Sequence, residues 1–223
     1  MKMKKVVGFL FVFWEIMKDK KYFDGIAAQW DKMRSAFFSQ GVREKAISVA
    51  NVEPGKIAAD IGAGTGFITE GLIQKGLKVI AIDQSEAMFV EMRKRFKDIE
   101  AIDYRIADAE NIPIEDGFVD YVFANMFLHH VDNPASAIKE MARILKLGGS
   151  LVITDLDEHN FEFLKTEHYD RWMGFKRDEV RCWFIEAGLK EIKVDCAGEN
   201  CCTMSILQDE YARISIFVAS GIK

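Results

Sequence analysis

The segment KIAADIGAGTGFITEGLIQ, residues 56–74, decides the fold of this chain. It joins a short apolar run (56–61), a glycine-rich turn (62–66) and an apolar helical pattern that begins at Phe67 and ends before Gly76. A strand, a tight glycine turn and a helix in this order are typical of the first unit of an open α/β sheet, in which ligands bind beyond the carboxyl ends of the strands. The turn is therefore the expected centre of the functional site.

The same alternation continues on both sides of this segment. Upstream, helical spacing predicts two helices within 22–50, separated at Gly41. Downstream, the pattern predicts strands at 78–83, 101–108, 119–125 and 150–156, and helices at 86–96, 134–145 and 178–187. Two last strands, at 191–195 and 212–220, flank a cysteine-bearing connection without a helix, so we expect an antiparallel hairpin at one edge of the sheet. The fold class is α/β: a Rossmann-like, doubly wound, mostly parallel seven-stranded sheet with that C-terminal hairpin.

Length and composition indicate one domain. The chain has 223 residues, of which 49% are hydrophobic and 29% charged, which suits a single buried core. We assign 1–21 to a basic and apolar appendage and 22–223 to one domain, with cap helices at 22–50 and a substrate lid at 156–180. Residues 1–16 either mediate a homodimer or reflect a mis-assigned start.

Charge, cysteine content and hydropathy limit the partners and the cellular compartment that we expect. A net charge of −5 does not favour nucleic acid as a partner. Four cysteines are too few for a disulfide framework in a chain of this length, so a reducing, cytoplasmic setting is expected. The apolar run near the N-terminus is shorter than the roughly 20 residues that cross a bilayer, and we expect no transmembrane segment.

The spacing of the glycines distinguishes two classes of nucleotide cofactor. In the dinucleotide fingerprint G-x-G-x-x-G, the third glycine lets the helix pack closely while the pyrophosphate rests at its N-terminus. Here the third glycine comes one residue earlier, and Phe67 stands where the fingerprint has glycine. A bulky ring there disfavours pyrophosphate, whereas the shorter turn suits a nucleoside cofactor that carries an amino acid and no phosphate.

Two acidic residues end neighbouring predicted strands. Asp83 follows the first glycine by about 20 residues, the spacing at which an acid accepts hydrogen bonds from ribose hydroxyls. Asp108 ends the third strand and precedes Ala109, where it can accept a hydrogen bond from an adenine amino group. Together with the turn, these residues predict a nucleoside lying across the strand ends.

Four motifs carry a resemblance to a known family. They are ADIGAGTGFIT (59–69), AIDQSEAM (81–88), ADAENIPIEDGFVDYVFANMFLHHV (107–131) and LKLGGSLVITD (145–155). In order and spacing they resemble the class I S-adenosylmethionine-dependent methyltransferases, most closely the ubiquinone and menaquinone C-methyltransferase branch. The resemblance covers about 20–155. It implies that S-adenosylmethionine is the cofactor and that the residues holding it are Asp60, Gly62, Gly64, Gly66, Asp83, Gln84, Met88, Asp108, Ala109 and Asn125.

Methyl transfer from a sulfonium to a small-molecule acceptor is an in-line displacement in a site that excludes water, and no metal is expected. The acceptor loses a proton, so a nearby base helps. His129 and His130 follow the fourth predicted strand, and we expect them to be the catalytic residues, since the pKa of histidine suits proton transfer. The large side chains expected around the substrate are Tyr22, Trp30, His159 and Trp172.

Two alternatives stay open. Cys196, Cys201 and Cys202 offer three thiols that bind a soft metal or metalloid, which is consistent with an arsenite or thiol methyltransferase. Cysteine is also a common small core residue, and that interpretation is favoured. The second alternative, an NAD-dependent oxidoreductase, is disfavoured by Phe67.

Overall fold

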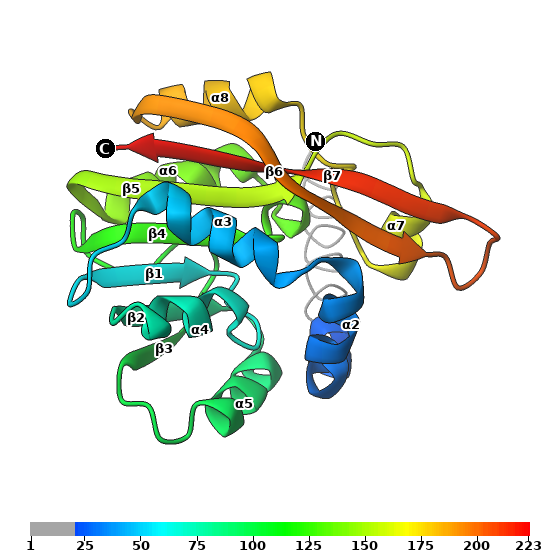
Figure 1. Ribbon diagram of the computed structural model, residues 1–223, viewed down its shortest axis with the longest axis horizontal. Coiled ribbons are helices and arrows are strands. Elements are labelled where there is room, and N and C mark those ends of the chain that lie inside the picture. Colours follow the sequence, from blue (N-terminus) through cyan, green and yellow to red (C-terminus); the bar gives the residue numbers. More distant parts are fainter. Residues whose placement is uncertain (1–20) are drawn as a thin grey trace, which may run out of the picture.

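The computed structural model describes residues 21–223, so the predicted homodimer contact through residues 1–16 lies outside the described part. Residues 21–223 form a seven-stranded sheet with the strand order β3-β2-β1-β4-β5-β7-β6 (Figure 1). The strands are β1 (Ile57–Ile61), β2 (Lys78–Asp83), β3 (Ile102–Ile106), β4 (Val119–Asn125), β5 (Leu145–Leu156), β6 (Lys190–Met204) and β7 (Tyr211–Ile222).

Helices cover both faces of the sheet. After a helical stretch over 21–26, the helices are η1 (Ala27–Gln29), α2 (Trp30–Phe37), α3 (Gln40–Ala50), α4 (Phe67–Gln74), α5 (Glu86–Arg95), η2 (Leu128–His130), α6 (Pro134–Ile144), α7 (Phe163–Glu167) and α8 (Arg177–Glu186). Helices α3 and α4 pack on one face through residues such as Val42 and Leu72. On the other face, α6 and α8 pack through Met141 and Phe184 (Figure 1). The two layers bury the strands, which explains their nearly continuous apolar sequences.

The pairing of the strands confirms the predicted doubly wound topology. Strand β1 pairs in parallel with β2 on one side and with β4 on the other, and β4 pairs in parallel with β5. Strand β7 is antiparallel to both β5 and β6, which makes β6–β7 the predicted hairpin at the sheet edge. The order of the strands reverses between β1 and β4, and a ligand site is expected beyond the carboxyl ends of these two strands.

The break between the first helices lies before the predicted position. Gly41 is inside α3, and the chain is extended at Phe38, with φ −153° and ψ 156°. Ser39 caps α3 because its side chain accepts a hydrogen bond from the backbone N–H of Gly41. The capping serine, rather than the glycine, therefore ends one helix and starts the next.

The cysteine-bearing segment is part of a strand, which corrects the prediction of a connection. Cys196 pairs with Phe217, Cys201 with Ile214 and Cys202 with Arg213 along β6–β7, and the register shifts between Cys196 and Asn200. Neighbouring residues of a strand point to opposite faces, and accordingly Cys201 is buried while Cys202 is partly exposed. The strand geometry separates the thiols, so the three cysteines do not form one site.

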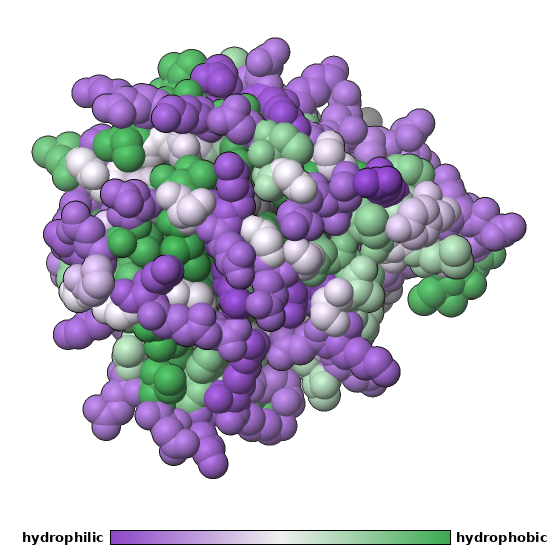
Figure 2. Space-filling view, viewed as in Figure 1, coloured by the Kyte–Doolittle hydropathy of each residue, from purple (hydrophilic) through white to green (hydrophobic). Residues whose placement is uncertain are grey.

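The β6–β7 hairpin extends beyond the body of the sheet and ends in an apolar tip. Ile206 and Leu207 in its turn are 83% and 79% exposed, and hydrophobic side chains gather at this end of the molecule (Figure 2). Among residues 21–223, no helix is long and apolar enough to cross a membrane. The cytoplasmic setting stays a prediction.

Candidate active site

A cleft of about 1130 Å³, counting its open mouth, lies at the carboxyl ends of β1, β2 and β4. The predicted cofactor residues that line it are Asp60, Gly62, Gly64, Asp83, Gln84, Met88, Asp108, Ala109 and Asn125. The predicted site residues therefore meet in one place, although they come from several separate strand ends. This is the position at which an open α/β sheet binds its ligand.

Two glycines of the turn leave room for different aromatic rings. Gly62 has a φ of +67°, and a Cβ atom there would lie 2.1 Å from the ring of Phe127. Gly66, with a φ of +92°, does not line the cleft; a Cβ there would lie 2.6 Å from the ring of Phe96. Gly66 thus lets the turn pack against the end of α5, and its contact with the cofactor stays a prediction.

Asp83 fixes the turn and faces the cleft. Its Oδ2 accepts a hydrogen bond from the backbone N–H of Gly64 at 2.8 Å, and its Oδ1 accepts one from the N–H of Ser85 at 2.9 Å. Burial raises the pKa of the Asp83 carboxyl, against the lowering effect of these backbone donors. A carboxylate has about four acceptor positions, and the N–H of Gln84 also contributes to holding this one. We expect the acceptor capacity that is left to face the hydroxyls of a ribose.

Asp60 links β1 to α4 behind the turn. It is 1% exposed, and its Oδ2 accepts hydrogen bonds from the backbone N–H and the hydroxyl of Thr69 at 2.9 and 2.6 Å. Burial raises the pKa of this carboxyl to about 7, although the Thr69 donors lower it. Because both bonds use Oδ2, Oδ1 is the atom that Asp60 offers to the amino end of a ligand.

Two further polar side chains line the cleft. Asp108, which follows β3, uses Oδ1 to accept a hydrogen bond from the N–H of Glu110 at 2.8 Å. Asn125, at the end of β4, uses Oδ1 to accept from the hydroxyl of Thr154 at 2.8 Å. The amide NH₂ of Asn125 therefore stays available as a donor at the cleft.

A second cavity of about 500 Å³ adjoins the cleft. Both cavities are lined by Phe23, Trp30, Phe38, Met126 and His130. The second cavity alone is also lined by Tyr22, Phe37, His129, Leu156, Leu164, His168, Asp170, Cys201 and Thr203. Its walls are thus largely aromatic and aliphatic, and they also include polar side chains such as His129, His168 and Asp170. We call it the acceptor chamber.

Of the residues predicted to contact substrate, Tyr22 and Trp30 line this chamber. Trp172 does not line either cavity, because its indole N–H donates to the carbonyl of Val131 at 2.8 Å. His159 is also outside both, and its Nδ1 accepts a hydrogen bond from the N–H of Phe161 at 3.3 Å. These hydrogen bonds hold the 156–180 segment to itself and to the end of η2, and the contacts of Trp172 and His159 with substrate stay a prediction.

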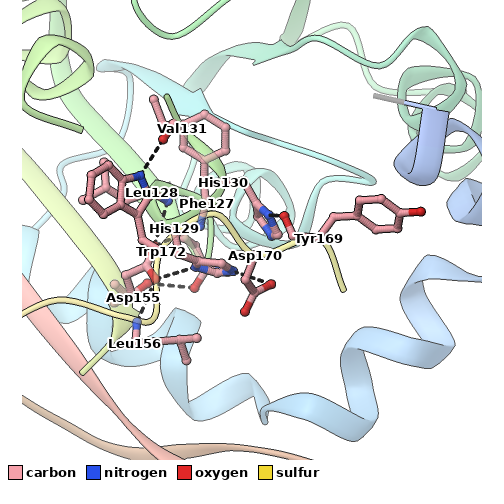
Figure 3. A network of polar contacts seen from close by, with 12 residues as sticks. Phe127, Leu128, His129, His130, Val131, Asp155, Leu156, Tyr169, Asp170 and Trp172 are labelled. Carbon is pink, nitrogen blue, oxygen red and sulfur yellow. Dashed lines mark hydrogen bonds and ion pairs between the residues drawn. The ribbon is translucent and has the colours of Figure 1, made fainter. Parts of the chain in front are cut away.

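His129 is held between two carboxylates in the polar wall of the acceptor chamber (Figure 3). Its Nδ1 lies 2.6 Å from Oδ1 of Asp155, and its Nε2 lies 3.9 Å from Oδ1 of Asp170. Burial lowers the pKa of His129, but the charges of Asp155 and Asp170 and the hydrogen bond to Asp155 together raise it to about 9.

His130 lies at the junction of the two cavities. Its Nδ1 is 3.4 Å from the carbonyl of Tyr169, and its ring centre is 4.1 Å from that of His129. Burial, followed by the charge of His129, holds the pKa of His130 well below its usual value. The two histidines therefore differ in charge at neutral pH: His129 is protonated and His130 is neutral.

Sequence reasoning missed two residues of this wall. Asp155 ends β5 and closes the fourth motif, so its position at a strand end was the signal that could have found it. It also accepts hydrogen bonds from the N–H groups of Phe127 at 3.1 Å and Leu128 at 2.7 Å. Asp170 lies in an irregular segment with no motif, and only the folded chain brings it to His129.

The raised pKa of His129 predicts a pH-dependent stability. A group whose pKa rises from 6.5 in the unfolded chain to about 9 in the fold contributes stability that is fully present below pH 6.5 and lost as the pH rises through 9. We expect His129→Gln to reduce the free energy of unfolding by about 3 kcal/mol more at pH 6 than at pH 9.5. Denaturant titrations of both proteins at the two pH values measure this difference, and parallel pH profiles would contradict it.

Comparison with known proteins finds methyltransferases that are similar to this chain. The family profile described as a methyltransferase domain matches residues 59–153. A demethylmenaquinone methyltransferase of Renibacterium salmoninarum is 30% identical over 155 residues, which cover 68% of this chain and 64% of the relative. The ubiquinone/menaquinone biosynthesis C-methyltransferase UbiE of Hydrogenovibrio crunogenus is 29% identical over 154 residues, covering 65% and 60%. The matched part spans less than two thirds of these curated relatives.

Solved structures share the fold. A putative methyltransferase of Haloferax volcanii, in complex with the Trm112 methyltransferase activator, superposes with a TM-score of 0.71 at 20% identity, over 90% of this chain and 96% of the other. Phosphoethanolamine N-methyltransferase 2 of Haemonchus contortus, in complex with S-adenosyl-L-methionine, gives a TM-score of 0.67 at 16% identity, over 81% and 52%. The motifs, the strand order and these similarities agree. Residues 59–153 match a methyltransferase domain, and the chain resembles the class I S-adenosylmethionine-dependent methyltransferases, including their ubiquinone and menaquinone C-methyltransferase branch.

Proposed function

We propose that this protein transfers the methyl group of S-adenosylmethionine to a small molecule bound in the acceptor chamber. The observation that carries the proposal is the shared wall of the two cavities, formed by Phe23, Trp30, Phe38, Met126 and His130. A cofactor in the cleft would direct its sulfonium toward this wall, and an acceptor in the chamber would approach from the opposite side. In-line displacement requires this arrangement, in which the sulfonium and the acceptor meet at the shared wall.

The cleft suits the cofactor at each end. We assign the ribose hydroxyls to Asp83, the amino acid end to Asp60 and the glycine turn, and the adenine to Asp108 and Ala109. Gln84, Met88 and Asn125 complete this set along the cleft. S-adenosylmethionine has no pyrophosphate, so its site needs no group that binds one. The bulky ring of Phe67 at the start of α4 is consistent with this.

The chamber favours a compact, largely apolar acceptor with one ionisable group. Tyr22, Phe23 and Trp30 provide aromatic walls, and His129 and His130 provide polar groups. In this assignment the acceptor gives up its proton at the histidine pair, where neutral His130 accepts it and protonated His129 stabilises the resulting anion. Hydroxyls of phenols or hydroquinones, or thiols, fit this description.

A transfer assay tests the proposal. The purified chain is incubated with S-adenosylmethionine labelled in the methyl group and with panels of hydroquinones, phenols and thiols, and labelled products are extracted and counted. We expect transfer to at least one class and a decrease in kcat of about 10²- to 10⁴-fold in His130→Ala, the range for loss of a general base. His159→Ala, which changes a histidine outside both cavities, is the matched control.

Calorimetry separates this function from the oxidoreductase alternative. The methyltransferase assignment predicts that S-adenosylmethionine and its demethylated product bind, whereas NAD does not. Binding of NAD in place of S-adenosylmethionine would reverse the assignment. The cysteine-based alternative loses its support, because Cys201 lines the acceptor chamber while Cys196 and Cys202 do not.

A further inference from the structure

Three metal-ligating side chains meet in the polar wall of the acceptor chamber. His129, His130 and Asp170 each offer one ligand atom, and these atoms lie within 4.8 Å of one another. His129 and Asp170 are buried, and His130 is half-buried. We propose that these three residues bind a divalent transition-metal ion, with Zn²⁺ as the preferred ion, and leave one coordination position open toward the acceptor. Two imidazoles and a carboxylate with an open position are the ligand set of catalytic zinc sites.

The distance between His129 and Asp170 is consistent with an ion between them. Nε2 of His129 and Oδ1 of Asp170 are 3.9 Å apart, which is too long for a hydrogen bond. Zinc bonds to nitrogen and to carboxylate oxygen measure about 2.0–2.2 Å. At the tetrahedral angle two such bonds span about 3.4 Å, so a shift of about 0.5 Å by either side chain would bring both atoms within bonding distance of one ion.

The other nitrogen of His129 already has the partner that a ligating histidine needs. Nδ1 lies 2.6 Å from Oδ1 of Asp155, a residue that is fully buried at the end of β5. Metal-bound histidines almost always donate their second N–H to a carboxylate or carbonyl, which fixes the ring and leaves the other nitrogen for the ion. Figure 3 shows the His129 ring between Asp155 and Asp170.

His130 is oriented in a similar way. Its Nδ1 is directed to the carbonyl of Tyr169 at 3.4 Å, so Nε2 is the atom that can bind an ion. His130 also lines both cavities, which places the site beside the junction where the methyl group would pass. Among residues 21–223, no other three histidine, cysteine or carboxylate side chains come together in this way.

The role of the ion rests on the proposed function. Binding of the ion would displace the proton of His129 and occupy Nε2 of His130, so the ion would take over the tasks that the two histidines have in the metal-free protein. A hydroxyl or thiol of the acceptor would occupy the open position and release its proton to solvent on binding, because coordination stabilises the anion. Its lone pair then forms the bond to the methyl carbon while the carbon–sulfur bond of the sulfonium breaks. The electron pair of that bond stays with the sulfur, so the cofactor leaves as the neutral thioether and the acceptor as the methyl ether or thioether.

Metal titration of the full-length protein tests the site without any measurement of activity. After treatment with a chelator and its removal, Zn²⁺ is titrated by calorimetry and Co²⁺ by visible absorption. We expect one ion per chain, with Co²⁺ d–d bands of a four- or five-coordinate site. His130→Ala and Asp170→Ala should each weaken binding at least about 10-fold, and Asp155→Asn about 10- to 100-fold, the range for loss of a supporting carboxylate.

Controls separate this inference from protein damage and from the proposed function. His159→Ala should bind the ion as the parent protein does. Each variant is also titrated with the demethylated cofactor product, which occupies the cleft and reports an intact fold. If a variant of Asp170 or Asp155 does not fold, metal titration of His130→Ala remains as the test, because His130 is only half-buried. Absence of stoichiometric binding in the parent protein, or unchanged binding in His130→Ala, overturns the metal site. Failure of cofactor binding with intact metal binding overturns the proposed function instead.

Discussion

Asp83→Ala is expected to weaken the binding of S-adenosylmethionine by about 100-fold or more. Hydrogen bonds to a charged group contribute roughly 1.5–3 kcal/mol each, and the carboxylate of Asp83 has positions for both ribose hydroxyls. Loss of two such bonds exceeds the 2.8 kcal/mol or so that corresponds to 100-fold. The substitution also leaves the N–H of Gly64 without its partner at 2.8 Å, so the turn loses its support as well. Calorimetric titration measures the effect.

A matched control is available on the neighbouring strand. Asp103 on β3 is exposed and pairs with Arg105 on the surface, so Asp103→Ala removes the same charge without touching the cleft. Thermal unfolding of both variants checks that the fold persists. If Asp83→Ala and the control bind the cofactor with equal affinity, the nucleoside does not lie across the strand ends as proposed.

Asp155→Ala is expected to destabilise the fold by about 3–5 kcal/mol, the range for removing one partner of a buried charged pair. The side chain is fully buried and accepts hydrogen bonds from the N–H groups of Phe127, Leu128 and Leu156 and faces Nδ1 of His129. Its loss leaves these buried donors without their acceptor. Denaturant unfolding followed by tryptophan fluorescence measures the change.

Asp195→Ala is the comparison for this variant. Asp195 lies on β6 and is exposed, so its loss should change the free energy of unfolding by no more than about 0.5 kcal/mol. A similarly small change in Asp155→Ala would show that Asp155 does not hold the η2 turn and the histidine in place.

The parallel half of the fold was predictable because each element has a local signal. Helix α4 and strands β2 and β4 have the predicted bounds, since glycines and short apolar runs mark their ends. Ser85 caps α5 because its side chain accepts a hydrogen bond from the N–H of Met88. Strand β6 was not predictable, because the polar stretch Gly198–Asn200 resembles a loop, whereas it is a register shift within a long hairpin.

The cofactor end and the acceptor end of the site also differ in how well the sequence predicts them. The cofactor end is built from residues that follow strand ends in consecutive motifs, so their order in the sequence places them together. The acceptor end gathers Tyr22, His129 and Asp170 from segments far apart in the chain. Sequence shows which aromatic and histidine residues exist but not where they point, and for this reason Trp172 and His159 were assigned to a chamber that they do not line.

The helical stretch that carries Phe23 and Trp30 lines the proposed binding sites of both reactants. Phe23 and Trp30 belong to neighbouring helical turns, and each contributes to the wall of both cavities. A displacement of this stretch uncovers cofactor and acceptor in the same event. Spent cofactor and methylated product are therefore expected to be released in step, and the rate at which these turns lift sets an upper limit on how often the enzyme can reload.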